Sequence, residues 1–511
     1  MYYDSVFLNF LYIIIKKIRD FYYNSFISRI ADKIGRFFKK LFSGSAVWNF
    51  IKRDDYFSKT WTESVFYKAM NLVINGFVVL GSKICLGFEN LFGASLILRL
   101  VKYLTGKFQI LIGSFLLLMV IIKHESWHDQ YSSIVILALT VLYFIGICLR
   151  NERFKISNID FVLAIFMVMV IIAEVFSISP SQSLKGFIFY VTCFLIVLLI
   201  ISSVKTPSDL NLLIGLMLVG VTITGLFSVW QYVTNSVKVS LEYTDITMSY
   251  GLRRMPSTFF NPNNYAIFLI ITLPFFFSSV LNAKTLLRKL LFIAMAVPPV
   301  IALFLTGTRA AWLALVFSIF IIILFKNRKL IPVFILLGIA CFPLLPAQIT
   351  DRIMTLTNFS ADKSSQYRLL IYKSVTPIIS DFWLTGGGLG NEVFARLFNR
   401  YYKFTGTGVI AHAHNVYLEL WIQMGIFGLL SFVWFMLRII KKSIKAIFGE
   451  ADKMLKNILV AGVAGIAGAL LIGFVEYIWF YPRVMIIFWA VVGIILAALG
   501  MLKTHKETKV E

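Results

Sequence analysis

Apolar runs of about 20 residues recur from Phe108 to Leu502, and they constrain the fold more than any other feature of this chain. A helix needs about 20 apolar residues to cross the hydrocarbon core of a bilayer. Because lipid offers no hydrogen-bond partners, the backbone groups of each run must be satisfied within the segment. Transmembrane strands would alternate apolar and polar residues over about ten positions, and these runs do not alternate. The sequence therefore predicts an all-α, polytopic integral membrane protein.

We predict about twelve transmembrane helices. The composition agrees, because the 511 residues are 59% hydrophobic and only 14% charged, which excludes an ordinary soluble domain. The predicted membrane domain covers residues 108–502. Its twelve segments are 108–123, 133–149, 159–178, 186–203, 210–233, 264–281, 287–306, 310–325, 330–345, 414–437, 457–475 and 484–502.

The net charge of +24 indicates a membrane orientation rather than a nucleic-acid partner. If the N-terminus is inside, the even-numbered connections between the predicted spans face the cytoplasm. These connections and the tail at 503–511 hold most of the Lys and Arg residues near the membrane, whereas the short connections on the other side hold few. Lys and Arg are enriched in short cytoplasmic loops. We therefore expect both termini in the cytoplasm.

Residues 1–107 differ from the membrane domain. Basic pairs alternate there with aromatic and aliphatic residues, as in segment 34–42. This pattern favours amphipathic helices that lie on the inner leaflet over a solvated cytoplasmic extension. Segment 72–98 is open to another interpretation, a hairpin that dips into the membrane.

One long connection, residues 346–413, interrupts the apolar runs. Loops longer than about 15 residues are usually functional or disordered. Helical patches such as 368–375 predict that this loop folds as a helical cap on the extracytoplasmic side of the membrane domain. The glycine-rich segment 386–390 is predicted to be a sharp turn, because it lacks the spacing of a nucleotide-binding loop.

Four polar features are expected at the outer membrane interface from the topology alone. Ionisable groups at such a boundary are candidates for a functional site. The features are segment 253–264 with Arg254, Asn261 and Asn263, the turn 306–309 with Arg309, Arg368 in the long loop, and segment 412–415 with His414 and Asn415.

The arginines suit an anionic ligand, because a guanidinium matches phosphate oxygens with two parallel donors. Several arginines that converge at a membrane surface would bind the diphosphate head group of a lipid. Arg309 is the strongest candidate, since apolar spans flank it on both sides. The alternatives are an arginine that reaches the lipid head groups and, for Arg368, an ion pair with an acidic residue of its own loop.

His414 belongs to a chain with only five histidines. Its ordinary pKa of about 6.5 suits a general base, and it would equally donate to a phosphate or sugar. The alternative is a histidine that only caps a helix. Asn261, Asn263 and Asn415 suit hydroxyl or phosphate binding, although Asn-Pro-Asn is also a turn and helix-cap sequence.

No metal site and no cofactor are expected. The histidines lack the spacing of a zinc-binding helix, and no pair of carboxylates stands near them. The four cysteines are scattered through the chain, without the spacing of a zinc site or a disulfide framework.

In this order, the segments resemble the O-antigen ligase and polymerase superfamily of bacterial membrane glycosyltransferases. The resemblance covers about residues 200–440. It rests on Arg254 to Asn263, the Thr-Gly-Thr-Arg309 turn, Arg368 with the turn 384–390, and the segment His414-Asn-Val-Tyr-Leu-Glu419 with Gly425 and Gly428. Trp383 departs from the family pattern, in which a proline often precedes the glycine-rich turn. The N-terminal 107 residues also have no counterpart in that pattern.

The resemblance implies an enzyme that moves a saccharide from an undecaprenyl diphosphate-linked donor to an acceptor hydroxyl. The reaction would take place on the outer face of the bacterial cell membrane, without a metal, as a polysaccharide ligase or polymerase. Arg254 and Arg309 would hold the diphosphate, and His414 would activate or position the acceptor. The acceptor, whether a lipid, a glycan or a protein, stays open.

Two other classes of protein compete with this interpretation. A transporter or flippase of lipid-linked saccharide would show paired inverted repeats with broken helices at the membrane midplane, and the sequence shows neither. A scaffold for envelope assembly would tolerate the loss of His414 and Arg309.

Overall fold

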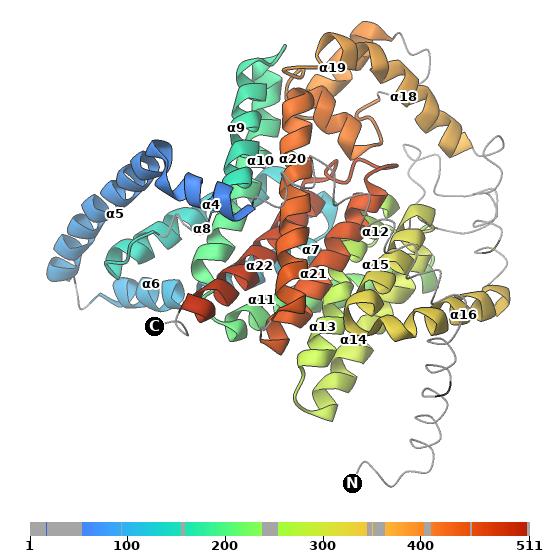
Figure 1. The fold of residues 1–511 in the computed structure, drawn as a ribbon, viewed down its shortest axis with the longest axis horizontal. Helices are drawn as coiled ribbons and strands as arrows, with labels where there is room; N and C mark the ends of the chain where they lie inside the picture. The colour runs from blue at the N-terminus through green and yellow to red at the C-terminus, as the bar shows by residue number, and fades with distance from the viewer. Residues whose placement is uncertain are drawn as a thin grey trace. The chain divides into compact units, whose positions relative to one another are not determined.

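The computed structural model describes Lys17, residues 54–92, 95–154, 159–237, 254–344, Thr350 and residues 363–402, 410–449 and 452–507. The chain divides into two compact units, residues 1–67 with 323–345, and residues 68–322 with 346–511. The residues that the structure describes form helices and loops without a strand, so the prediction of an all-α membrane protein is confirmed (Figure 1).

The first unit holds short helices. They are α4 (Asp54–Glu63), η3 (Arg328–Leu330), α16 (Ile331–Cys341) and η4 (Phe342–Leu344). Most of the N-terminal segment on which we base the interfacial helices, including residues 34–42, lies outside the described residues.

The second unit holds the membrane helices and the candidate site. Along the chain, α5 and α15 cross the division between the units. The helices are α5 (Val65–Phe92), α6 (Leu96–Gly106), α7 (Phe108–Ile121), η1 (His124–Ser126), α8 (Asp129–Leu149), α9 (Phe161–Val175), α10 (Pro180–Ser203), α11 (Pro207–Val233), α12 (Pro262–Thr272), α13 (Pro274–Asn282), α14 (Leu286–Leu305), α15 (Arg309–Asn327), α18 (Lys363–Asp381), α19 (Asn391–Tyr401), α20 (Val416–Phe448), α21 (Lys453–Ile472) and α22 (Pro482–Glu507).

Within the described residues, ten helices are long and apolar enough to cross a membrane, or eleven if a bent pair counts as one span. Nine of them fall on predicted segments, and the tenth is Tyr67–Gly87, inside the region expected to be interfacial. The described residues thus hold ten or eleven candidate spans, consistent with the prediction of about twelve.

The other three predicted segments form helices that are either too short to span the membrane or part of a bent pair. The segment at 108–123 is one arm of the bent pair, with a 79° bend between α6 and α7. The segments at 159–178 and 330–345 form only α9, of 15 residues, and α16, of 11 residues. At about 1.5 Å per residue, both fall short of a hydrocarbon core of about 30 Å.

Three spans form the interior of the second unit. The apolar windows of α22, of α12 with α13, and of α21 are 89%, 83% and 78% buried, whereas that of α14 is only 17% buried. Close approach of backbones is possible because α21 carries small residues: a Cβ on Gly465 would lie 2.4 Å from the carbonyl oxygen of Ile271 in α12. Small residues at helix interfaces are the usual means of packing in membranes.

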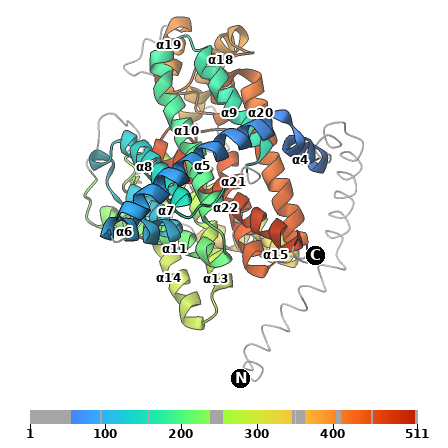
Figure 2. The same cartoon turned by 90° about the vertical axis from the view of Figure 1, so that its left-hand side faces the viewer.

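The long loop forms two helices within its described residues. Its helices α18 and α19 lie together at one end of the bundle in both views (Figures 1 and 2). They share a hydrophobic cluster with the segment before α20 and with one residue of α20 itself. Its members are Ile371, Val375, Ile378, Val393, Phe394, Leu397, Phe398, Ile410, Ala413 and Ile422. Burial of this cluster holds the cap helices on the start of α20.

Helix α20 breaks at Gly425, where φ is 69° and ψ is −177°. The glycine-rich segment 386–390, a turn as predicted, lies against the break. Ile426 N donates to Trp383 O at 2.7 Å, and Gly387 N donates to Ile422 O at 2.7 Å. The backbone groups freed by the break therefore bond to the loop, as burial requires.

The break requires glycine at position 425. The positive φ disfavours any residue with a Cβ, and a Cβ there would lie 2.0 Å from Leu384 O. We expect Gly425→Ala to lower the free energy of unfolding by roughly 2 kcal/mol or more. Thermal unfolding in detergent measures this change.

Gly215→Ala in α11 is the matched control, because no atom lies within 4 Å of the added Cβ. This change should leave stability unchanged or raise it by up to about 1 kcal/mol. Equal melting temperatures for the two variants would show that the break does not depend on Gly425.

Candidate functional site

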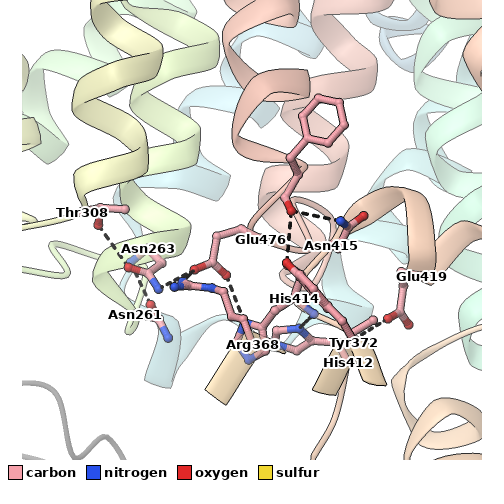
Figure 3. Close-up of polar contacts among 12 residues, drawn as sticks. Asn261, Asn263, Thr308, Arg368, Tyr372, His412, His414, Asn415, Glu419 and Glu476 are labelled. Atoms are coloured by element: carbon pink, nitrogen blue, oxygen red, sulfur yellow. Dashed lines mark hydrogen bonds and ion pairs between the residues drawn. The ribbon is translucent and has the colours of Figure 1, made fainter. Parts of the chain in front are cut away.

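A buried carboxylate, Glu476, lies at the centre of the polar groups at the capped end of the bundle (Figure 3). It stands in the loop 473–481 between α21 and α22 and is 5% exposed. Its Oε1 accepts hydrogen bonds from the guanidinium of Arg368 and, at 3.2 Å, from Asn263 Nδ2. Its Oε2 lies 3.2 Å from His414 Nδ1. Residues from α12, α18 and the start of α20 thus converge on one side chain.

Arg254 extends this group. Its Nη2 donates to Asn263 Oδ1 and, at 3.2 Å, to Thr308 Oγ1. Its Nε donates to Thr306 O at 2.8 Å. We call Arg254, Asn263, Arg368, His414 and Glu476 the Glu476 cluster. It joins three of the four polar features that the sequence singled out, and the Thr306-Thr308 turn of the remaining one contacts it directly.

The loop that carries Arg254 is fixed to the membrane helices. Met255 N donates to Leu305 O at 2.9 Å, and Thr258 Oγ1 donates to Val120 O at 2.6 Å. The amide of Gln231 bonds both backbone groups of Ser257, at 2.9 and 3.3 Å. These bonds hold Arg254 in place before any ligand arrives.

His414 has a left-handed backbone, with φ of 48°. Such a conformation costs on the order of 1 kcal/mol or more outside glycine. Local contacts maintain it: His414 N donates to His412 Nδ1 at 3.1 Å, and Tyr372 Oη donates to His414 O at 3.1 Å. This backbone turns the imidazole of His414 toward Glu476.

The charges of the cluster determine which ring nitrogen of His414 carries the proton. Burial alone would raise the pKa of Glu476, but Arg368 and His414 outweigh it and hold that pKa well below its usual range. The ionised Glu476 accepts a hydrogen bond from the Nδ1–H of His414, so in this tautomer of a neutral imidazole Nε2 carries the lone pair. Removal from solvent, together with His414, lowers the pKa of His412 well below its usual value, so His412 stays neutral.

The cluster favours an anion together with an acceptor of protons. Its five members include two guanidinium groups, Arg254 and Arg368, and one carboxylate, so basic groups outnumber acidic ones in the cluster. The side chains of Arg368 and His414 are 19% and 24% exposed, which leaves them accessible from one side. Such an arrangement binds phosphate oxygens and places a base beside them.

Two of the predicted asparagines cap the first turns of helices. Asn261 Oδ1 accepts from Asn263 N at 2.8 Å and caps α12. Asn415 Oδ1 accepts from Tyr417 N and Leu418 N and caps α20, while its Nδ2 donates to Phe474 O at 2.9 Å. Their role in ligand binding stays a prediction.

Arg309 begins α15, directly after Thr308, and is 9% exposed. Its backbone thus lies one residue from a side chain that bonds Arg254 and Asn263. Its predicted role in holding a diphosphate stays a prediction.

Glu476 is the residue that sequence reasoning missed. A lone carboxylate between two apolar runs was the available signal, because such a residue marks a functional site by default. Within the described ranges, no group of three or more His, Cys, Asp and Glu side chains has metal-binding geometry. Independence from metals stays a prediction.

The pairing of Glu476 predicts how stability depends on pH. Because its pKa is lowered by folding, its contribution is fully present above the unfolded pKa of about 4.3 and is lost as pH falls toward the folded value. We expect Glu476→Gln to cost about 2 kcal/mol at pH 7, and the difference from wild type to shrink below about pH 4. Chemical unfolding in detergent at several pH values measures both.

Glu392→Gln is the control, because Glu392 pairs with Lys185 at an exposed site with 55% and 54% of the two side chains accessible. Such a pair contributes little. A Glu476→Gln variant as stable as Glu392→Gln at pH 7 would contradict the central role of Glu476.

Part of the site lies in a segment that matches a known protein family. No curated protein sequence matches the chain. A family model described as O-antigen ligase matches residues 267–433, a segment that holds Arg309, Arg368 and His414, whereas Arg254 and Glu476 lie outside it. Residues 267–433 of this multi-pass membrane protein therefore match the O-antigen ligase family, in agreement with the resemblance to the O-antigen ligase and polymerase superfamily.

Proposed function

We propose that this protein transfers a saccharide from an undecaprenyl diphosphate-linked donor to an acceptor hydroxyl. The O-antigen ligase domain indicates a ligase or polymerase type of activity in glycan assembly. The observation that carries the finer proposal is the Glu476 cluster, in which His414 and Arg368 bond one buried carboxylate and Arg254 bonds its partner Asn263.

The arginines would bind the diphosphate of the donor. As the bond between the sugar carbon and the diphosphate oxygen breaks, negative charge grows on the leaving group. Arg254 and Arg368, with Arg309 beside them, are donors held in place before the reaction, and such preorganised donors stabilise a transition state strongly. Asn263, bonded to both Arg254 and Glu476, sets the spacing between them.

His414 would activate the acceptor. Its Nε2 takes the proton of the acceptor hydroxyl, the hydroxyl oxygen forms a bond to the anomeric carbon, and the diphosphate leaves with the electron pair. Glu476 holds the ring through Nδ1 and stabilises the imidazolium that forms. Direct displacement of this kind inverts the configuration at the sugar carbon.

The distribution of basic residues supports a reaction outside the bacterial cell membrane, with both termini in the cytoplasm. The site lies at the end of the bundle that holds α18 and α19, and this end is opposite the basic connections in the predicted topology. A lipid-linked donor would reach the site from the bilayer, and the acceptor would reach it from the outer solvent.

A transporter of lipid-linked saccharide is the competing function. Helix α20 does break at Gly425, and broken helices occur in transporters. Loop 383–388, however, bonds the backbone groups on both sides of this break. An ion or substrate would have to displace those bonds, so the break favours a fixed support for the site.

We expect His414→Ala to lower the rate of transfer by roughly 10² to 10⁴, the usual contribution of a general base. The assay uses the full chain in liposomes, with undecaprenyl diphosphate-linked glycan and a cell-envelope extract as the source of acceptor. His128→Ala is the matched control, since His128 is exposed before α8 and outside the Glu476 cluster. Full transfer by His414→Ala would refute the proposed mechanism.

The same assay tests binding of the donor and distinguishes a polymerase, a ligase and a transporter. Arg254→Lys keeps the charge but loses the fork, so the KM for the donor should rise by roughly tenfold or more. Lengthening of the donor glycan itself marks a polymerase, and a new product marks a ligase. Movement of labelled lipid across the bilayer without transfer would favour the transporter.

The proposed orientation predicts which introduced cysteines react in intact cells. In a chain without its four native cysteines, Lys373→Cys on α18 should react with a membrane-impermeant maleimide. Arg288→Cys at the start of α14 should react only after permeabilisation. Both positions are exposed, so the reversed pattern would place the site on the cytoplasmic side.

A further inference from the structure

An aromatic pocket lies next to the Glu476 cluster and is not explained by the chemistry above. The start of α10, residues 390–392 and residues 477–485 form its walls. Five aromatic side chains line it: Phe189, Tyr190, Tyr477, Trp479 and Phe480. The pocket lies wholly within the second unit.

The pocket and the cluster share the loop 473–481. Glu476 of this loop contributes to the cluster, whereas its neighbour Tyr477 and nearby Phe480 line the pocket. The ring of Phe480 lies 4.3 Å from that of His412, which lies 4.0 Å from the ring of His414, measured between centroids. The proposed base is thus separated from the wall of the pocket by one imidazole ring.

The pocket also has polar groups suited to hydroxyls. Gln182 lines it, and its Oε1 is buried without a hydrogen-bond donor among the described residues. A buried acceptor without a partner costs about 1–3 kcal/mol, so rotation of the Gln182 amide toward a ligand hydroxyl in the pocket would relieve it. Lys185 and Glu392 pair at 3.1 Å in the same wall, so the pocket carries no excess charge for a diphosphate.

We propose that this pocket binds a sugar ring of the acceptor glycan. A sugar ring presents a C–H face that packs on aromatic side chains and hydroxyls that bond groups such as Gln182 Oε1. An isoprenoid chain would leave that oxygen without a partner, and the diphosphate has its arginines in the Glu476 cluster. The proposal rests on the proposed function, and it places the acceptor on the His412 side of His414.

The test measures sugar binding directly, without a donor or a transfer step. The full chain in lipid nanodiscs is studied by saturation-transfer NMR with methyl β-D-glucoside, methyl β-D-galactoside and methyl N-acetyl-β-D-glucosaminide. We expect at least one of these sugars to bind the wild type. Gln182→Leu and Phe189→Leu should each weaken binding by about tenfold, the loss expected for one hydrogen bond or stacking contact.

Phe187→Leu is the matched control, because Phe187 lies on α10 two residues from Phe189 and does not line the pocket. It should bind the sugar like the wild type. The proposal is overturned if none of the three sugars binds, if Phe187→Leu weakens binding as much as Phe189→Leu, or if undecaprenyl phosphate displaces the sugar.

The outcome is independent of the transfer reaction. Sugar binding that depends on Gln182 and Phe189 supports the pocket even if the wild type transfers nothing, a result that would reject only the proposed function. In an active enzyme, Gln182→Leu should raise the KM for the acceptor by about tenfold and leave the KM for the donor unchanged. An increase confined to the donor KM would reject the assignment of the pocket to the acceptor.

Discussion

Burial of the Glu476 carboxylate between two membrane spans is the constraint on which the functional end of this protein depends. An ion of this kind costs several kcal/mol to remove from water unless partners surround it. Arg368, Asn263 and His414 supply those partners from three separate segments. Each segment must therefore be in its native position before the charge is satisfied, so folding of the cap and assembly of the site are one event.

The same constraint makes the site responsive to an anion. Arg368 serves Glu476 in the structure, and a diphosphate that approaches would share its guanidinium. Arg254 is linked to Glu476 through Asn263, which bonds both side chains. The cluster thus holds both arginines in place around one carboxylate, where they can meet an anion without rearrangement.

Local backbone strain lies at the same end of the molecule. His414, Ser257 and Phe260 all have positive φ, and Gly425 breaks α20. Each lies in or beside a segment that carries part of the cluster or supports it. The membrane helices supply the rigidity that maintains such conformations, which is how strained loops persist at functional sites.

The sequence predicted the features that depend on local signals. Apolar length identified most spans, and α9 and α16 differ because an apolar run does not reveal where a helix ends. Arg254, Asn263, Arg368 and His414 were singled out by residue type and topology. Their common partner was not, because Glu476 is 62 residues from His414 and 213 from Asn263 along the chain, and no periodic pattern records such a contact.

The loop 473–481 joins the two halves of the proposed reaction. Its start is held by Val416 N, which donates to Gly473 O at 2.8 Å, and by Asn415 Nδ2, which donates to Phe474 O. The one hydroxyl proton of Tyr372 is shared between Phe474 O and His414 O, each 3.1 Å from Oη. The cap helix α18 and the start of α20 therefore fix the backbone from which Glu476 faces the arginines and Tyr477 faces the aromatic pocket. A shift of α18 would move Arg368, the Glu476 carboxylate and the pocket wall together. Through the cap, binding of a ligand at the arginines can therefore affect binding in the aromatic pocket.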